Sequence, residues 1–150
     1  MKEQLKYFLH SVTVLPEHID PNNHLNNIVY LQWMQDAAIE HVQANGVFKL
    51  TEELGLTWFA KKHTIEYLAQ GFLDDEIVVI TWVETLTKIS TLRKYHIYRK
   101  SDKKLLCKGE TLWIMINLEK GRPTKIPQTV VDLFWKTTDF DVEDISDLVL

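Results

Sequence analysis

The segment from Asn27 to Asn45 constrains the fold most, because it reads as one long helix with apolar residues around most of its circumference. These residues recur at helical spacing: Ile28, Val29, Leu31, Trp33, Met34, Ala37, Ala38, Ile39 and Val42. A helix of this kind is buried rather than laid on a surface. We therefore predict that residues 27–45 form a central helix, capped by Asn26 or Asn27 and ended by Gly46.

The sequence after this helix is typical of an antiparallel sheet. Four segments rich in Val, Ile, Thr, Trp and Tyr follow one another with short turn-like breaks, at residues 57–69, 76–88, 91–100 and 104–118. Strands joined by short links are antiparallel neighbours. A further strand is expected at residues 7–15 and a short helix at residues 127–135. The economical arrangement is an α+β domain whose sheet of about five strands wraps around the one long helix.

Length and composition indicate a single domain over residues 1–150, with its core at about 8–135 and an acidic tail at 137–150. The chain has 17 basic and 21 acidic side chains and a formal net charge of -4, which argues against nucleic-acid binding. Cys107 is the only cysteine, so it forms no disulfide framework, and we expect it to be a buried core residue. No apolar run is long enough for a signal peptide or a membrane span, so we expect a cytoplasmic protein.

A dense polar cluster immediately precedes the central helix. Residues 17–27 hold two His, one Asp and four Asn. A helix N-terminus has unpaired N–H groups that can polarise a carbonyl oxygen, and a carboxylate beside it can act as a base or nucleophile. Asp20 and the N–H of Asn27 therefore suggest a minimal acyl-transfer site, although Asp20 is also typical of a turn and the Asn residues of caps. No metal site is expected, because too few ligands are gathered here.

A family resemblance rests on this cluster. The stretch His18-Ile19-Asp20-Pro21-Asn22-Asn23-His24-Leu25-Asn26-Asn27, followed by Tyr30 and Trp33, resembles the signature of hotdog-fold thioesterases. Within these enzymes, the motif is most similar to that of the 4-hydroxybenzoyl-CoA thioesterase-like group and of the acyl-carrier-protein thioesterases. Weaker support comes from residues 65–68, 109–111 and 122–127, so that the resemblance runs from about residue 8 to 135. It implies a hotdog fold.

The resemblance also implies roles for individual residues. Asp20 takes the position of the catalytic carboxylate, with Asn22 and His24 beside it, and the backbone N–H of Asn27 polarises the thioester carbonyl. The expected substrate-binding residues fall in two groups, an acyl pocket and a strip for CoA phosphates: Tyr30 and Tyr67 in the first, and Lys88, Ser90 and Arg93 in the second.

Some positions depart from the family pattern. His18 stands where many members have a second Asp, and Asn23 stands where Gly is common. Gln70 and Gly71 replace the Glu-Cys pair of the plant-type enzymes. These differences leave the chemistry to Asp20 with Asn22 and His24.

The implied activity is hydrolysis of an acyl-CoA or acyl-carrier-protein thioester in lipid metabolism, without a cofactor other than the CoA of the substrate. Asp20 would either activate water or attack the carbonyl directly. A hotdog dehydratase or isomerase and a non-catalytic acyl-CoA-binding domain are the alternatives. Members of the family join edge to edge, so we expect a homodimer or homotetramer with each site between protomers. The sequence does not set the acyl group.

Overall fold

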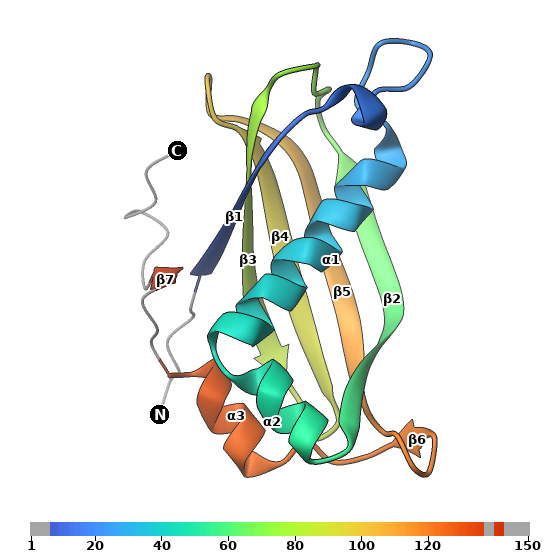
Figure 1. Ribbon diagram of the computed structural model, residues 1–150, viewed down its shortest axis with the longest axis vertical. Coiled ribbons are helices and arrows are strands. Elements are labelled where there is room, and N and C mark those ends of the chain that lie inside the picture. Colours follow the sequence, from blue (N-terminus) through green and yellow to red (C-terminus); the bar gives the residue numbers. More distant parts are fainter. Residues whose placement is uncertain (1–6, 137–139, 143–150) are drawn as a thin grey trace.

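A computed structural model describes residues 7–136 and 140–142 of the protein. In these residues a curved antiparallel sheet holds one long helix against its inner face (Figure 1). The predicted α+β hotdog architecture is confirmed. The elements in chain order are β1 (Tyr7–Thr13), a short 3-10 helix (Pro16–His18), α1 (Asn27–Ala44), α2 (Val47–Glu53), β2 (Leu56–Tyr67), β3 (Glu76–Leu86), β4 (Ser90–Arg99), β5 (Lys104–Asn117), β6 (Arg122–Pro123), α3 (Gln128–Phe134) and β7 (Asp141–Val142).

The sheet has the strand order β2-β5-β4-β3-β1-β7, and β6 pairs with β5. Its five long strands match the segments predicted from the sequence to within two residues at most ends. The two additional strands, β6 and β7, have two residues each, which is too short to produce a periodic pattern. β2 lies at one end of this order and pairs only with β5 among the described residues.

Helix α1 begins where the Asn26 side chain accepts a hydrogen bond from the Ile28 N–H at 3.1 Å. This contact satisfies one of the unpaired N–H groups of the first turn. The helix ends before Gly46, whose φ of 86° lies in the left-handed region that glycine adopts without strain. Both predicted end signals are therefore confirmed, with Asn26 as the cap.

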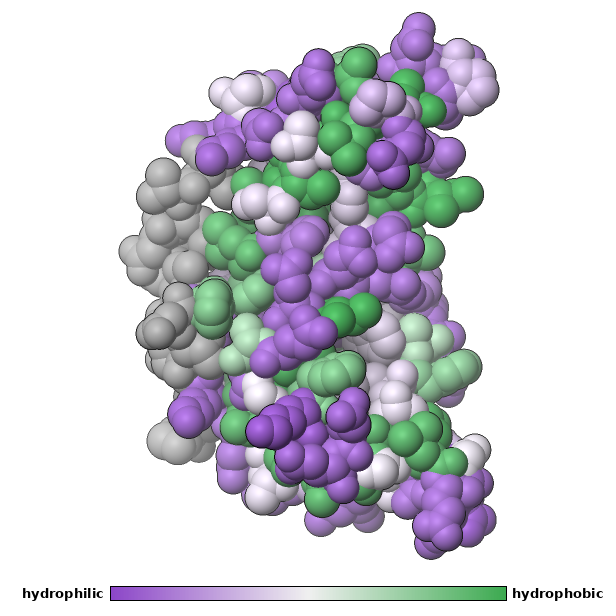
Figure 2. Space-filling view, viewed as in Figure 1, coloured by the Kyte–Doolittle hydropathy of each residue, from purple (hydrophilic) through white to green (hydrophobic). Residues whose placement is uncertain are grey.

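The prediction that α1 is buried all round is wrong for a single chain. Its inner face is buried against the sheet, and the buried residues are Tyr30, Trp33, Met34, Ala37, Ala38 and His41. On the other face Ile28 is 73% exposed and Ile39 is 46% exposed. Figure 2 shows hydrophilic side chains along this outer face with apolar ones beside them. One sheet can cover only one side of a helix, so the outer apolar residues remain accessible.

Two smaller helices close the lower end of α1 in Figure 1. Helix α3 was predicted over residues 127–135, and in the structure it spans Gln128–Phe134 with Pro127 as the N-cap instead of the first helical residue. Helix α2 was not predicted, because its seven residues are too few to show helical periodicity. Together with β2 and β5 these helices enclose a second apolar cluster, separate from the main core between α1 and the sheet.

Most of the acidic tail predicted for residues 137–150 lies outside the described residues. Within it, Asp141 and Val142 form β7 beside β1. None of the helices in the described part of the chain has the length and apolar character needed to cross a membrane.

Candidate active site

The loop before α1 fixes the Asp20 carboxylate through backbone groups. Asp20 Oδ1 accepts hydrogen bonds from the N–H of Asn22 at 2.9 Å and from that of His24 at 3.1 Å. The Asp20 N–H in turn donates to the carbonyl oxygen of His24 at 2.9 Å. Asn23 makes this tight turn with a φ of 63°, in the left-handed region that Asn tolerates. Oδ2 has no hydrogen-bond partner among the described residues, so it is free to act on a substrate.

The N-terminus of α1 lies at the same loop. The Asn26 side chain occupies the N–H of Ile28, but the backbone N–H of Asn27 has no acceptor within the described residues. Asn27 is also exposed. A free N–H with the helix dipole behind it can donate a hydrogen bond to a carbonyl oxygen on which negative charge develops.

These groups share a pocket of about 300 Å³ at the upper end of the sheet. It is lined by Asp20, His24, Leu25, Asn27, Tyr30, Tyr67, Leu68, Ala69 and Gln70. The structure therefore brings together five of the residues predicted from the sequence: Asp20, His24, Asn27, Tyr30 and Tyr67. They come from the loop, from α1 and from the end of β2, which are distant in the sequence.

Two tyrosines form the inner wall of this pocket. The Tyr67 hydroxyl donates to the carbonyl oxygen of Asn27 at 3.0 Å, and that of Tyr30 donates to Ala69 at 3.4 Å. Burial, with a smaller contribution from Cys107, raises the pKa of Tyr30 to about 12. Burial also raises the pKa of Tyr67. Both phenols are therefore protonated near neutral pH, and they position backbone rather than transfer protons.

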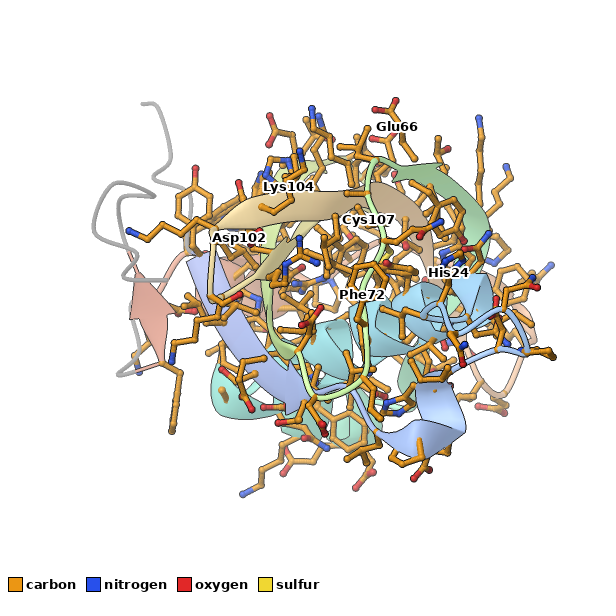
Figure 3. The ribbon with its side chains drawn as sticks, turned by 90° about the horizontal axis from the view of Figure 1, so that it is seen from above. His24, Glu66, Phe72, Asp102, Lys104 and Cys107 are labelled. Carbon is orange, nitrogen blue, oxygen red and sulfur yellow. The ribbon has the colours of Figure 1, made fainter. Side chains whose placement is uncertain are left out.

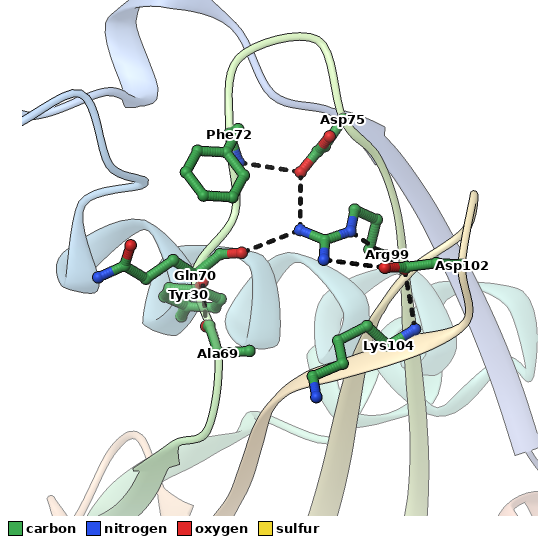
Figure 4. Close-up of polar contacts among 8 residues, drawn as sticks. All are labelled: Tyr30, Ala69, Gln70, Phe72, Asp75, Arg99, Asp102 and Lys104. Atoms are coloured by element: carbon green, nitrogen blue, oxygen red, sulfur yellow. Dashed lines mark hydrogen bonds and ion pairs between the residues drawn. The ribbon is translucent and has the colours of Figure 1, made fainter.

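An arginine that the sequence reasoning did not single out holds the opposite wall of the pocket (Figure 4). Arg99 Nη1 donates to the Gln70 carbonyl oxygen at 3.0 Å and to Asp75 Oδ2 at 3.3 Å. Its Nε and Nη2 donate to the two oxygens of Asp102, each at 3.0 Å. Asp75 Oδ2 also accepts from the Phe72 N–H at 2.9 Å. Arg99 thus fixes the loop between β2 and β3 from below.

This loop touches the candidate catalytic loop directly. The Leu25 N–H donates to the Gly71 carbonyl oxygen at 3.1 Å. The rings of His24 and Phe72 meet edge to face with centroids 6.2 Å apart, and Figure 3 shows both at this end of α1. The two loops therefore support each other around Asp20.

Cys107 lies in the core behind Tyr30 rather than in the pocket wall. It is fully buried, and burial together with Glu66 raises the pKa of its thiol to about 12. A thiol in this state is not a nucleophile at neutral pH. The prediction that Cys107 is a core residue is confirmed.

Asn22 and the expected phosphate strip do not belong to the pocket. The Asn22 side chain is exposed, and this residue contributes its backbone N–H to Asp20.

Lys88 is exposed but lies at the opposite end of the sheet, where its carbonyl oxygen accepts from the Ile126 N–H at 2.9 Å. A phosphate contact at Lys88 stays a prediction. The Ser90 hydroxyl is 2.6 Å from that of Thr87, and Ser90 is only 8% exposed, so it is not an open position on the surface. The phosphate contact predicted for Ser90 also stays a prediction.

Arg93, the last residue of the predicted phosphate strip, is buried instead of lying on the surface. The phosphate contact predicted for it also stays a prediction. Arg93 is 2% exposed and points from β4 toward α1. Its Nη1 donates to His41 Nδ1 at 3.0 Å and to Thr81 Oγ1 at 3.1 Å. His41 Nε2 lies 2.9 Å from Asp141 Oδ1. Because an arginine can only donate, Nδ1 is the acceptor of this bond, and the proton of a neutral His41 is on Nε2, the atom that faces Asp141.

No group of three or more His, Cys, Asp or Glu in the described ranges, 7–136 and 140–142, is placed to hold a metal ion. The pocket therefore offers one carboxylate, one imidazole and a helix N-terminus. This set of groups can polarise a carbonyl and deliver a nucleophile to it.

Comparison with protein families gives a match to the thioesterase-like superfamily over residues 14–134, which is most of the chain and includes the whole pocket. The chain belongs to the thioesterase-like superfamily. A search of curated protein sequences found no match.

Solved thioesterase-like structures have the same fold. YbaW, a probable thioesterase from Escherichia coli, is 15% identical with a TM-score of 0.79 over 86% of this chain and 99% of that chain. A hypothetical protein from Staphylococcus aureus in complex with CoA is 24% identical, with a TM-score of 0.77 over 92% and 88%. An acyl-ACP thioesterase from Bacteroides thetaiotaomicron is 24% identical, with a TM-score of 0.76 over 89% and 55%.

Proposed function

We propose that this thioesterase-like protein hydrolyses an acyl-CoA thioester, with Asp20 as the catalytic carboxylate. One observation carries the proposal. A carboxylate with one oxygen anchored by two backbone N–H groups and the other free lines the same pocket as the unpaired N-terminus of α1. An anchored carboxylate keeps its orientation while the helix end binds the thioester carbonyl, and this alignment lowers the barrier to acyl transfer.

In the proposed reaction the Asn27 N–H donates to the thioester carbonyl oxygen and stabilises the charge that develops there. Two routes start from this arrangement. In the first, Asp20 takes a proton from water, the hydroxide adds to the carbonyl carbon, and the C–S bond breaks to release acid and thiol. In the second, Asp20 Oδ2 adds to the carbonyl carbon and expels the thiolate, and water then hydrolyses the mixed anhydride. His24 lies beside Asp20 and would orient the water.

CoA is the preferred carrier because a solved relative of this fold carries CoA in its complex. The acyl-ACP thioesterase has the same fold, so acyl-carrier protein is the second candidate. Hydrolysis is preferred over dehydration or isomerisation because Asp20 and His24 share one short loop, whereas an acid–base pair for those reactions is expected on separate elements.

We also propose that the protein works as a homodimer joined along β2. This strand has 12 residues and lies at the end of the sheet, with Phe59 59% exposed and Tyr67 44% exposed. An uncovered edge strand of this length tends to pair with another chain. Since Tyr67 also lines the pocket, a second copy along β2 would border the same site. Light scattering at micromolar concentration should give twice the chain mass or a multiple of it, and a monomer would contradict the proposal.

The decisive experiment compares Asp20→Asn with the intact protein on a panel of acyl-CoA esters, with thiol release followed by a thiol reagent. The amide keeps an oxygen that accepts the two N–H bonds but can neither take a proton nor attack, so kcat should fall by about 10² to 10⁴-fold. Asp132→Asn, the same change at an exposed carboxylate on α3, is the control and should be unaffected. Unchanged thiol release by Asp20→Asn would refute the assignment. Tight ester binding without turnover by the intact protein would favour the binding-domain alternative.

A further inference from the structure

A second cavity lies at the other end of α1, and no part of the proposed reaction uses it. Its volume is about 340 Å³, within the range of small-molecule sites. Side chains from α1, α2, α3 and the strands β2, β4 and β5 form its mostly apolar wall, including Trp58, Trp113 and Phe134. Ala38 on this wall lies eleven residues after Asn27, which is about 16 Å along the helix. The cavity is therefore distinct from the pocket of Asp20 within one chain.

Arg93 supplies charge to this apolar cavity. It lines the wall although it is 2% exposed. Only Nη1 has hydrogen-bond partners among the described residues, namely His41 and Thr81, and these lie outside the set of wall residues. Nε and Nη2 are left without an acceptor in the described part of the chain. A buried guanidinium with unsatisfied donors is costly unless an anion or polar group meets it.

The contacts on the far side of Arg93 hold the guanidinium in place. His41 receives one N–H from Arg93 and bridges to Asp141, while Thr81 receives another. The rings of Phe8 and His41 stack with centroids 5.0 Å apart, which fixes His41 in turn. No carboxylate in the described residues is within ion-pairing distance of Arg93 itself. The free donors are therefore set in position before any ligand arrives.

The other residues of the cavity wall determine which kind of ligand can bind. The Trp58 Nε1–H is buried without an acceptor in the described residues, so it is a further donor on this wall. Around the donors most of the wall is aliphatic and aromatic, with Thr51, Thr57 and Thr91 as its uncharged polar residues. The rim holds Ile39, which is 46% exposed, Phe48, which is 45% exposed, and the exposed Glu52. A ligand that fits has an anionic acceptor at its inner end and an unbranched apolar chain toward the rim. A guanidinium binds carboxylates well because its paired N–H groups match the two oxygens.

We propose that this cavity binds a medium-chain aliphatic carboxylate, with its carboxylate on the free donors of Arg93 and its chain between α1 and the sheet. The inference goes beyond the proposed hydrolysis, since it needs neither Asp20 nor a thioester. Either a free fatty acid or the distal carboxylate of a dicarboxylic acyl ester supplies the same chemistry.

The test is a titration of the full-length protein with octanoate, followed by the fluorescence of Trp58 and Trp113, with octanol as the uncharged ligand of equal chain length. Octanoate should bind at least tenfold more tightly than octanol. Ala38→Leu should weaken octanoate at least tenfold by filling the cavity, whereas Ala44→Leu, on the same helix but outside the wall, should not. In Asp20→Asn, which should not hydrolyse the esters, octanoyl-CoA has no free carboxylate and should not displace octanoate. The CoA monoester of octanedioic acid should displace it there only if the distal-carboxylate source is correct.

Two further variants separate the possible failures. Arg93→Met should bring the affinities for octanoate and octanol to within twofold of each other, and Asp20→Asn should leave octanoate binding unchanged. If Arg93→Met does not fold, the comparison of octanoate binding by Ala38→Leu and Ala44→Leu still tests the proposal. Equal binding of octanoate and octanol by the intact protein, or octanoate binding that Ala38→Leu does not weaken, would overturn the proposal. Neither result bears on thioester hydrolysis.

Discussion

The two ends of helix α1 hold pockets of similar size but opposite construction. At the N-terminal end backbone groups do the positioning, because Asp20 is held by two N–H groups of its own loop. At the other end side chains do it, since Arg93 is held by His41 and Thr81 from separate elements. A site built by a continuous loop leaves a motif in the sequence, whereas a site assembled from residues scattered over six elements does not. The comparison explains why one pocket was predicted and the other was not.

After Asp20→Asn, the largest expected effect distinguishes the side-chain role of His24 from its backbone role in the upper pocket. His24→Ala should lower kcat about 10²-fold, because it removes the imidazole that orients water. The backbone N–H of His24, which holds Asp20, is kept. Steady-state hydrolysis of acyl-CoA esters measures the change, with KM expected to stay within about threefold. A kcat close to that of the intact protein would mean that His24 serves only through its backbone.

The next effect concerns the loop that Arg99 holds. Arg99→Met should lower the free energy of unfolding by about 1–2 kcal/mol, because the partly buried bonds to Gln70 and Asp75 are lost. Urea denaturation gives this number. Since the same loop accepts the Leu25 N–H, kcat/KM should also fall. Arg122→Met, at an exposed arginine on β6, is the control. Full activity and stability in Arg99→Met would show that the loop holds its position without the arginine.

A smaller effect is expected from the cap of α1. Asn26→Ala should cost about 1 kcal/mol of stability, as is usual for the loss of an N-cap side chain. Asn26→Asp keeps the acceptor and should retain most of the stability. Thermal unfolding followed by circular dichroism compares the two variants. Equal losses in both would mean that the side chain has another role.

The smallest expected effect is on the pH dependence of stability, and it concerns His41, which holds Arg93 beside the lower pocket. Burial lowers the pKa of His41 below its usual 6.5, so the unfolded chain takes up a proton at a higher pH than the folded protein. The corresponding stability is present above about pH 6.5 and is lost as the pH falls toward the folded pKa. His41→Gln can still accept the N–H of Arg93 but does not titrate. Between pH 7.5 and pH 5.5 this variant should lose less stability than the intact protein. If the melting temperatures of the two proteins differ by the same amount at both pH values, the proposed titration of His41 is refuted.

The fold was predicted well because its signals are local. Segments rich in β-forming residues, separated by short turn-like breaks, predicted most of the long strands, and Asn26 and Gly46 predicted the ends of α1. The exposed outer face of α1 could not be predicted. The sequence shows which residues of the helix are apolar, but it does not show which of them the sheet covers. Helix α2 and strands β6 and β7 are too short for their periods to appear.

The burial of Arg93 was not foreseen for a different reason. Its charge suggested a surface role, but it shares one face of β4 with Thr91, Tyr95 and Ile97, all of which are buried. Alternation along a strand would have placed Arg93 inside. Arg99 was missed because its partners, Gln70, Asp75 and Asp102, are distant or unremarkable in the sequence, and only the folded sheet brings the loops together.

The turn at Asp20 has a consequence for how this family can vary. Because Oδ1 is held by the N–H groups two and four residues later, what the site specifies is a count of residues rather than the side chains between them. Pro21 and Asn22 are exposed, so the anchoring of Asp20 does not depend on their side chains. Position 23 needs a residue that accepts a left-handed backbone, such as Asn or Gly. Inserting one residue between Asp20 and His24 would keep every side chain of the site. It would nevertheless change the spacing of the two N–H groups and turn the carboxylate away from the helix.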